Sequence, residues 1–260
     1  MKERFVTQFL QSITSPRFYQ EIGSRRVSDG VRYFSFLILL VTALLSVRFT
    51  SDIFKGLASF ETWSKEHLPE IVIEKGKVFV DVPQPWQREE GGFVIVIDTT
   101  GKTHELDEKY PQGVLLSQNR ILLKRSPYES RHYDLSKIDS FRLNPTTIQS
   151  WRKVSQWVIP PLLSLFLFVY FWVGKFSQIV FFSGVSLLTN WVSKRGLPYG
   201  TLLTIGMYAI TPPLLLFCVV VLLGAQVRFF DTIYLSSYAA LLVTAVLQCH
   251  PRTDEMVENS

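Results

Sequence analysis

Cysteine is scarce in this sequence. Only two of the 260 residues are cysteines, and Cys218 and Cys249 both fall in or beside apolar segments. The polar middle of the chain, from Ser51 to Trp151, contains none. A disulfide framework and a cysteine-based metal site are therefore excluded from that region.

Patterns that indicate catalysis or metal binding are also missing. The four histidines, His67, His104, His132 and His250, lie far apart and have no partner at ligand spacing. No Gly-x-Ser-x-Gly nucleophile motif occurs. We therefore predict no catalytic residue, no metal and no cofactor, and a protein that is not an enzyme.

Charged residues make up only 19% of the chain, whereas 47% of it is hydrophobic. The apolar residues concentrate in two regions, Val31–Val47 and Val154–Leu247, and the region between them has an ordinary charged composition. This distribution predicts a membrane protein with one water-soluble insert.

The positions of the basic residues explain the net charge of +5. Six basic residues and three acidic ones precede or begin the first apolar run, and a basic flank beside a membrane span indicates a cytoplasmic N-terminus. The insert then lies outside the cell. We predict the lipid bilayer as a partner, possible contact with another membrane protein, and no nucleic acid.

Five regions follow from this pattern. They are a cytoplasmic amphipathic segment at 1–30, a first span at 31–50, an extracytoplasmic β-rich domain at 51–151, a C-terminal transmembrane bundle at 152–249 and a polar tail at 250–260. No small-x-small cleavage site follows the first apolar run, which is therefore expected to be a retained anchor. The amphipathic segment is suited to the lipid headgroup region or to packing on the membrane domain.

The number of spans leaves two alternatives. The apolar stretch from Val154 to Val192 is too long for one crossing, and we expect two short spans with a turn at Gly174–Lys175. This gives about five spans and places Lys194–Arg195 and the C-terminus outside. A four-span alternative places both inside. The fold class is an α-helical polytopic membrane protein with a small, mostly β extracytoplasmic insert.

Ionisable residues in the apolar regions are expected at turns. Lys175, Arg228 and Asp231 all fall at such positions. Because transporters usually carry charges at membrane depth, this counts against active transport. Two proline pairs, Pro160–Pro161 and Pro212–Pro213, are expected to kink or break helices.

The insert contains the alternating patterns of a β meander. "EIVIEKGKVFVDV" predicts a hairpin around Lys75–Gly76, "FVIVID" a third strand, "GVLLSQNRILLKR" a second hairpin and "SRHYDLSKI" a further strand. A helix is expected at Leu57–Leu68. Pro83, Pro85 and Trp86 indicate a loop.

"GGFVIVIDTTGKTHEL" is similar to phosphate-handling motifs at one point but fails their requirements. A Walker A loop needs glycine where Val96 stands, and the phosphorylated-aspartate motif needs lysine where Thr99 stands. We therefore predict a strand followed by a turn, in which Asp98 and Thr99 bond to nearby backbone and Gly101 takes a positive φ.

The layout and several segments resemble a known family. They are "QSITSPRFYQEI", then one span, then "IVIEKGKVFVDVPQPW" and "VIVIDTTGKT", then clustered spans. The chain is similar to bacterial membrane proteins of domain of unknown function 1189, some of which are annotated for maltodextrin utilisation. Its C-terminal half distantly resembles Yip proteins at Tyr208, Ala209 and Pro212. The resemblance implies a location in the bacterial cytoplasmic membrane. The expected signature residues are Gly76, Asp98, Thr99, Gly101, Tyr208, Pro212 and Pro213.

Three functions remain open at this point. The first is a non-enzymatic accessory, assembly or sensing component that presents the β domain, linked to carbohydrate uptake. The second is a channel or transporter component that uses the proline-kinked spans. The third is glycan binding by exposed aromatic side chains such as Trp86 and Tyr110.

Overall fold

The computed structural model describes residues 2–22 and 25–249, so His250 and the expected polar tail lie outside the described residues. The chain divides into two compact units. One, the membrane unit, holds the residues up to Ser51 and those from Ile159 on, and the other, the β unit, holds Asp52–Val158.

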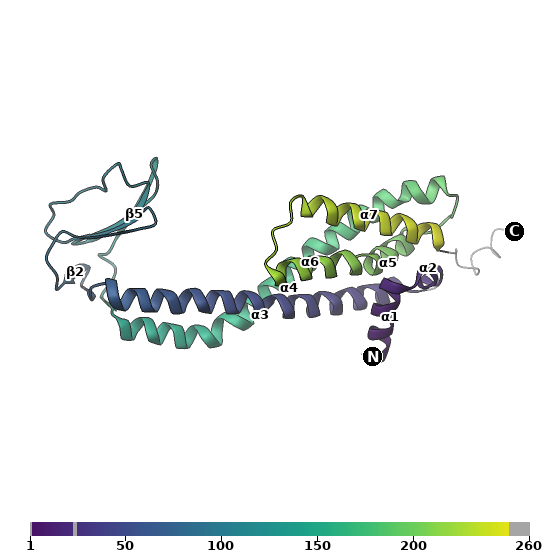
Figure 1. Ribbon diagram of the computed structural model, residues 1–260, viewed down its shortest axis with the longest axis horizontal. Helices are drawn as coiled ribbons and strands as arrows, with labels where there is room; N and C mark the ends of the chain where they lie inside the picture. Colours follow the sequence, from purple (N-terminus) through teal and green to yellow (C-terminus); the bar gives the residue numbers. More distant parts are fainter. Residues whose placement is uncertain (1, 23–24, 250–260) are drawn as a thin grey trace. The chain divides into compact units, whose positions relative to one another are not determined.

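Seven helices form in the described residues (Figure 1). They are α1 (Lys2–Thr14), α2 (Pro16–Gln20), α3 (Val27–His67), α4 (Pro145–Val192), α5 (Tyr199–Ala209), α6 (Thr211–Leu223) and α7 (Phe230–Gln248). Four helical stretches are long and apolar enough to cross a membrane: α3, α4, α5 together with α6, and α7. α3 and α4 each contain residues of both units.

The expected turn at Gly174–Lys175 is wrong, because α4 is one continuous helix of 48 residues. A single glycine costs a helix only about 1 kcal/mol, which an apolar run on both sides readily offsets. Lys175 therefore lies within a helix, as does Asp231, and only Arg228 lies in a connection. The expected count of about five spans is not found among the described helices, where four candidates occur.

The two proline pairs have different effects. Pro160 and Pro161 lie inside α4, which continues past them. Pro212 and Pro213 occupy the first turn of α6, where a missing backbone N–H leaves no hydrogen bond unmade. The break between α5 and α6 falls at Ile210, just before this second pair, as the sequence predicted.

Aromatic side chains form the centre of the membrane unit. Tyr208 on α5 is fully buried, and its ring centroid lies 4.4 Å from that of Tyr33 on α3 and 5.2 Å from that of Phe18 on α2. The hydroxyls of Tyr33 and Thr211 lie 2.8 Å apart in a hydrogen bond. These contacts join α2, α3, α5 and α6 into one core.

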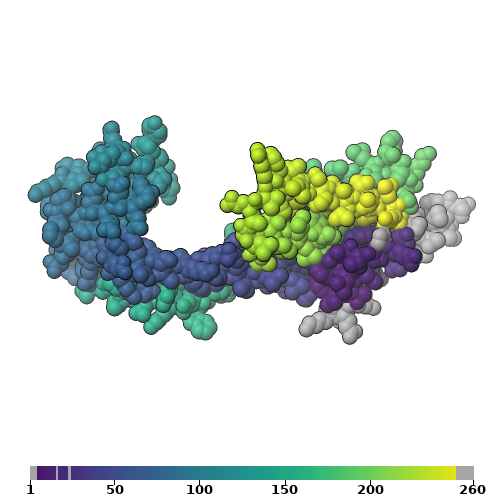
Figure 2. Space-filling view, viewed as in Figure 1, coloured from purple at the N-terminus to yellow at the C-terminus, as the bar shows by residue number. Residues whose placement is uncertain are grey.

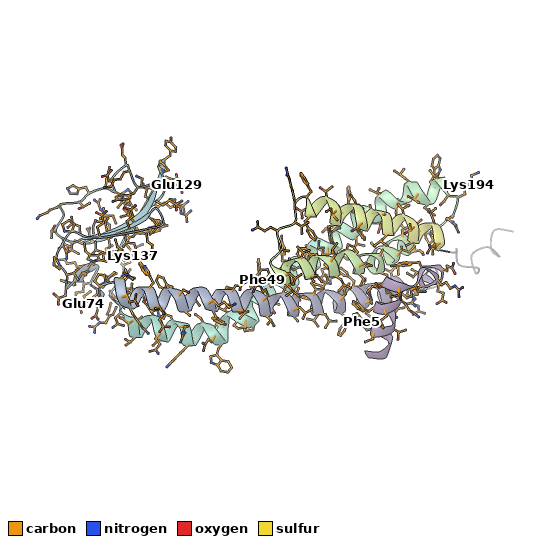
Figure 3. All side chains as sticks on the ribbon, in the orientation of Figure 1. Phe5, Phe49, Glu74, Glu129, Lys137 and Lys194 are labelled. Atoms are coloured by element: carbon orange, nitrogen blue, oxygen red, sulfur yellow. The ribbon has the colours of Figure 1, made fainter. Side chains whose placement is uncertain are left out.

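α1 packs on this core with one face. Phe5 lies 5.3 Å from the ring of Tyr33 and 4.3 Å from that of Phe36, and Figure 3 shows it where α1 meets α3. Its other face exposes Val6, Leu10 and Ile13. α1 therefore packs on the membrane unit, as one of the two alternatives predicted, and a place in the lipid headgroup region stays a prediction.

Small residues allow the helices of the membrane unit to approach closely. A Cβ placed on Gly206 of α5 would lie 2.9 Å from Ser183 Oγ of α4 and 3.1 Å from the Tyr238 hydroxyl of α7. That hydroxyl donates to the Gly206 carbonyl at 3.3 Å. Close packing of this kind drives helix association in lipid. α6 and α7 also pack together, and both are visible on one face of the membrane unit (Figure 2).

Eight strands form the β unit. They are β1 (Ile71–Glu74), β2 (Lys77–Val80), β3 (Trp86–Glu90), β4 (Phe93–Asp98), β5 (Gln112–Ser117), β6 (Arg120–Ser126), β7 (Glu129–Asp134) and β8 (Ser140–Leu143). A three-stranded sheet has the order β2-β1-β8, and a five-stranded sheet has the order β3-β4-β5-β6-β7. Both predicted hairpins, β1–β2 and β5–β6, are confirmed.

The expected meander is wrong in one connection. β4 and β5 pair in parallel, so residues 99–111 form a crossover that returns the chain to the start of the neighbouring strand. The sequence also missed two edge strands, β3 and β8. Prolines before β3 indicated a loop up to Trp86, which instead begins the strand, and β8 (SFRL) alternates but is only four residues long.

Each face of the five-stranded sheet has its own core. Ile97 and Leu116 pack with Ile71, Ile73 and Val78 of the three-stranded sheet. On the opposite face, Val94, Val96, Leu115 and Leu122 pack with Leu106 and Tyr110 of the crossover. The crossover thus covers a face that a simple meander would leave exposed.

The β1–β2 turn fits closely against the chain after β7. Lys75 and Gly76 both have positive φ, at 46° and 76°. The Gly76 N–H donates to the Ile138 carbonyl at 2.9 Å, and the Lys75 N–H to that of Asp139 at 2.8 Å. A Cβ on Gly76 would lie 2.7 Å from Ser136 Cα, which leaves room for no side chain.

We predict that Gly76→Ala destabilises the β unit by about 2–4 kcal/mol, because backbone strain and a steric clash add. Gly92→Ala is the matched control, since Gly92 also has positive φ but has no atom within 4 Å of the added Cβ. The control should lose only about 1 kcal/mol from the left-handed conformation. Hydrogen exchange of the β1–β2 amides in the full chain measures both effects, and equal effects would contradict the packing argument.

Candidate ligand-binding site

The sequence singled out Asp98, at the end of β4, and the structure shows what its carboxylate does. Oδ1 accepts from the Thr100 N–H at 2.9 Å and the Thr100 hydroxyl at 2.6 Å, and Oδ2 accepts from the Thr103 N–H at 2.6 Å. Gly101, between these partners, has φ +80°. Both oxygens of Asp98 are therefore engaged in shaping the turn, as predicted.

The electrostatics of Asp98 agree with a structural role. Its side chain is fully buried, and although burial alone would raise the pKa, hydrogen bonds from Thr100 and Thr103 lower it to about 2. The carboxylate is thus ionised in neutral solution and has no face open to a phosphate.

Thr99 differs from its prediction in its partner. Its N–H donates to Gln84 Oε1 at 2.6 Å, and its hydroxyl donates to the same oxygen at 2.8 Å. The turn is thereby tied to the segment before β3 through a side chain instead of nearby backbone.

Trp86 and Tyr110 do not form an aromatic cleft. Trp86 packs against the core between the two sheets, whereas Tyr110 is buried in the core beneath the crossover, on the opposite face of the five-stranded sheet. The Tyr110 hydroxyl accepts a hydrogen bond from Gln87 Nε2 at 2.6 Å. Tyr110 is 8% exposed, so it is not the exposed side chain that the sequence suggested, and a glycan contact by Trp86 or Tyr110 stays a prediction.

A different group of aromatic side chains lines an open hollow in the β unit. The hollow has a volume of about 470 Å³, and its lining is mainly apolar. The last turns of α3 and the β3–β4 pair supply the lining residues, which are Ser59, Phe60, Trp63, Arg88, Glu90, Phe93 and Ile95. A volume of this size is within the range of small-molecule sites.

Strand register explains why the hollow forms. Arg88 pairs with Ile95 and Glu90 pairs with Phe93, so all four side chains point to one face of the β3–β4 pair. Phe60 is 46% exposed and Phe93 is 37% exposed, so both present ring surface to solvent. The strands therefore supply an apolar floor with one cation and one anion beside it.

Trp63 is held in a fixed orientation at this hollow. Its ring stacks on Phe60, with centroids 6.0 Å apart, and on His67, with centroids 5.6 Å apart. Its Nε1–H donates to Glu90 Oε2. His67 in turn contacts the Trp63 carbonyl oxygen through Nδ1 at 2.9 Å. The spacing of these aromatics on one helix was visible in the sequence, but the missed strand β3 concealed their partners.

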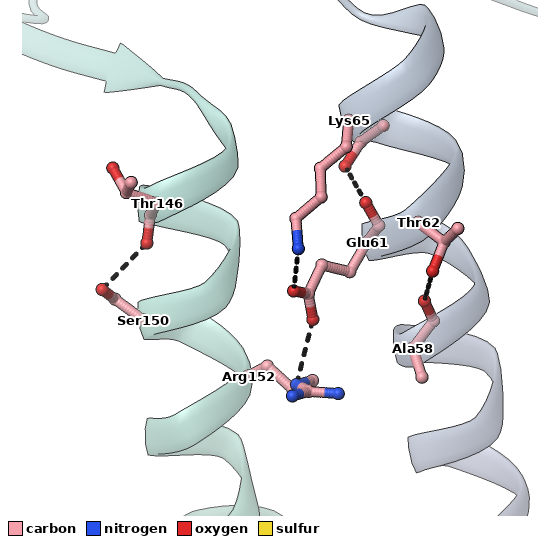
Figure 4. A network of polar contacts seen from close by, with 8 residues as sticks. Ala58, Glu61, Thr62, Lys65, Thr146, Ser150 and Arg152 are labelled. Atoms are coloured by element: carbon pink, nitrogen blue, oxygen red, sulfur yellow. Dashed lines mark hydrogen bonds and ion pairs between the residues drawn. The ribbon is translucent and has the colours of Figure 1, made fainter.

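An ion cluster joins α3 to α4 within the β unit (Figure 4). Glu61 is 6% exposed, and its Oε1 accepts from Lys65 Nζ at 2.8 Å. Its Oε2 lies 3.0 Å from Arg152 Nε, in an ion pair that is not aligned as a hydrogen bond. Glu61 lies two residues before Trp63, so the cluster fixes the part of α3 that lines the hollow.

Metal ligation has no support in the described residues. Among residues 2–22 and 25–249, no group of three histidine, cysteine or carboxylate side chains is placed to hold a metal ion. Cys218 and Cys249 are both buried.

One comparison with known proteins identifies the chain. A family model described as "Protein of unknown function (DUF1189)" matches residues 6–246. The chain belongs to the DUF1189 family. No curated protein and no solved structure matches it. The links to maltodextrin utilisation and to Yip proteins stay predictions.

The expected DUF1189 signature residues divide between the two units. Gly76, Asp98, Thr99 and Gly101 shape two turns of the β unit, as described above. Tyr208 lies in the centre of the membrane unit, and Pro212 and Pro213 begin α6. In this DUF1189 chain none of the seven lines the hollow.

We predict that acid removes the contribution of Asp98 to stability. The pKa of the Asp98 carboxyl is about 2 in the folded chain, against 3.8 for an unperturbed aspartate. The stability that Asp98 contributes is therefore complete above pH 4 and disappears as pH falls toward 2. The difference corresponds to roughly 2 kcal/mol. Hydrogen exchange of the crossover amides between pH 5 and pH 2 should show this loss in the wild type and a smaller one in Asp98→Asn.

A second prediction concerns the ion cluster. Glu61→Ala leaves Arg152 without its buried partner and should lower the unfolding temperature of the full chain. Glu66→Ala, on the exposed side of the same helix, is the control and should change it little. Equal midpoints for the two variants would show that the cluster contributes nothing.

Proposed function

We propose that this protein is a non-enzymatic component of the bacterial cytoplasmic membrane that presents the β unit outside the cell as a ligand-binding or sensing module. The aromatic hollow carries the proposal. It combines exposed ring faces with Arg88 and Glu90 at one surface, and such a mixture of apolar area and few polar groups is typical of binding sites.

A count of four membrane crossings supports a β unit outside the cell and a cytoplasmic N-terminus. An even number of spans places both chain ends on one side, together with Lys194 and Arg195 of the α4–α5 connection. Figure 3 shows Lys194 at the end of α4. This arrangement puts the basic connection in the cytoplasm beside the basic N-terminal segment, as the positive-inside rule favours. The four-span alternative therefore agrees with the charges better than five spans do.

A carbohydrate is the ligand class that we propose for the hollow. The C–H face of a sugar ring stacks on aromatic side chains such as Phe60 and Phe93, while the hydroxyls reach Arg88 and Glu90 at the surface. Carbohydrate binding connects this module to the uptake role suggested by the family resemblance. A sensing role follows from the chain itself, because α3 runs from the hollow into the membrane unit without a break in its helix.

A channel or transporter component is the alternative. The α5–α6 break at Ile210 is the discontinuous helix that such proteins use. However, Tyr208, Ala209, Ile210, Thr211 and Leu214 around it are all fully buried. Dry packing at the break favours a structural role and leaves the binding module as the better proposal.

The test uses the full chain in lipid nanodiscs, titrated calorimetrically with a linear maltodextrin. We expect saturable binding that weakens about tenfold in Phe60→Ala, because one aromatic stack contributes up to roughly 1.5 kcal/mol. Phe79→Ala is the matched control, since Phe79 is 53% exposed on β2 and does not line the hollow. Absence of binding to the wild type, or equal weakening in both variants, would overturn the carbohydrate proposal.

A further inference from the structure

Lys175 is a cation in the membrane unit and plays no part in the hollow of the β unit. It lies near the middle of the long apolar helix α4 and is half-buried. A charged side chain within an apolar span costs several kcal/mol unless it is paired or reaches the headgroup region, so its presence indicates a function.

The surroundings of Lys175 are aromatic and polar but carry no counter-charge in contact. Its Nζ lies 4.2 Å from the ring centroid of Tyr234 on α7 and 5.6 Å from that of Phe217 on α6. It also donates to Gln178 Oε1 at 3.3 Å. Within the described part of the chain, no carboxylate forms an ion pair with Lys175.

Gln178, one turn further along α4, has a donor left over. Its Oε1 accepts from Lys175 and from the Tyr234 hydroxyl at 3.5 Å, whereas its Nε2 is buried without a hydrogen-bond partner among the described residues. An unsatisfied buried amide costs about 1–3 kcal/mol. Nε2 is covered by its neighbours, so the donor that an anion can reach is the ammonium of Lys175, which Gln178 Oε1 orients from the next turn of the helix.

The depth of Lys175 fits a lipid headgroup. Tyr234 lies four residues into α7 and Phe217 lies six residues before the end of α6, so both are about 6–9 Å from the α6–α7 connection. A lysine at that depth extends its stem toward the interface. The connection, residues 224–229, adds a second cation, Arg228, and the exposed ring of Phe229.

We infer that Lys175 and Gln178 form a binding site for the phosphate of an anionic phospholipid. Lys175 supplies the charge, Gln178 orients the ammonium through Oε1, and the rings of Tyr234 and Phe217 hold the lysine side chain in place. The site is open to lipid because Lys175 is half-buried and its neighbour Val173 is 53% exposed. The assignment does not depend on a ligand in the β unit.

The test compares the unfolding temperature of the full chain in detergent with added phosphatidylglycerol or phosphatidylcholine. Phosphatidylglycerol should raise the midpoint of the wild type by about 2–4 °C relative to phosphatidylcholine. Lys175→Met should lose this difference, since methionine keeps the stem and removes the charge. Lys153→Met is the matched control on the exposed part of the same helix and should keep it.

Further variants distinguish a lipid site at Lys175 from other causes of the lipid effect. Gln178→Leu should reduce the lipid effect while leaving Lys175 in place, and Lys175→Arg should retain it. Native mass spectrometry should show one phosphatidylglycerol fewer on Lys175→Met than on the wild type. Asp231→Asn should retain or strengthen the effect, because Asp231 lies in the first turn of α7 and repels an anion.

Three results would overturn the site. They are an undiminished phosphatidylglycerol effect in Lys175→Met, an equal midpoint shift from inorganic phosphate alone, and loss of the lipid effect in Asp231→Asn. The second result would mean that the source of the phosphate is the solution and not a lipid, and the third that Lys175 acts through Asp231.

Discussion

α4 is long and apolar enough to cross a membrane, and a helix that does so must satisfy its own backbone groups because hydrocarbon offers no hydrogen-bond partner. This requirement explains why Gly174 and the Pro160–Pro161 pair do not end the helix. Between α5 and α6 the interruption at Ile210 is slight: its N–H still donates to the Gly206 carbonyl at 3.2 Å, and Pro212 and Pro213 fall in the first turn of α6.

Within the membrane unit, the polar groups show where packing is complete and where it is not. The Tyr33 and Thr211 hydroxyls pair with each other, and the Tyr238 hydroxyl pairs with the Gly206 carbonyl. Gln178 Nε2 has no partner among the described residues, and it lies beside the one lysine of the apolar part of α4. A satisfied network stabilises a core, whereas a half-buried lysine without a carboxylate in contact, beside an unsatisfied amide, is consistent with a ligand.

The β unit separates its structural and its binding residues in the same way. Asp98 and Thr99 form hydrogen bonds within the β unit and Gly76 packs closely against Ser136, so these expected signature residues maintain the fold. Phe60 and Phe93 instead leave ring surface exposed, while Glu90 and His67 hold Trp63 in place. The Glu61 cluster fixes α3 against α4 directly beside this hollow. Rigid support beneath an exposed aromatic surface is what a binding site requires.

The sequence by itself determined the division into apolar and polar regions, both hairpins and the turn at Asp98, because alternation, glycine and short polar side chains act locally. It did not determine that β4 and β5 pair in parallel, since strand pairing joins residues that no local pattern connects. It also assigned Lys175 to a turn, because a charge within an apolar run resembles a boundary. Only the tertiary structure placed Trp86 and Tyr110 on opposite faces of one sheet, brought Phe93 to Phe60 and Trp63, and set Lys175 against Tyr234 of another helix. Each of these depends on contacts between distant segments, which burial and packing decide.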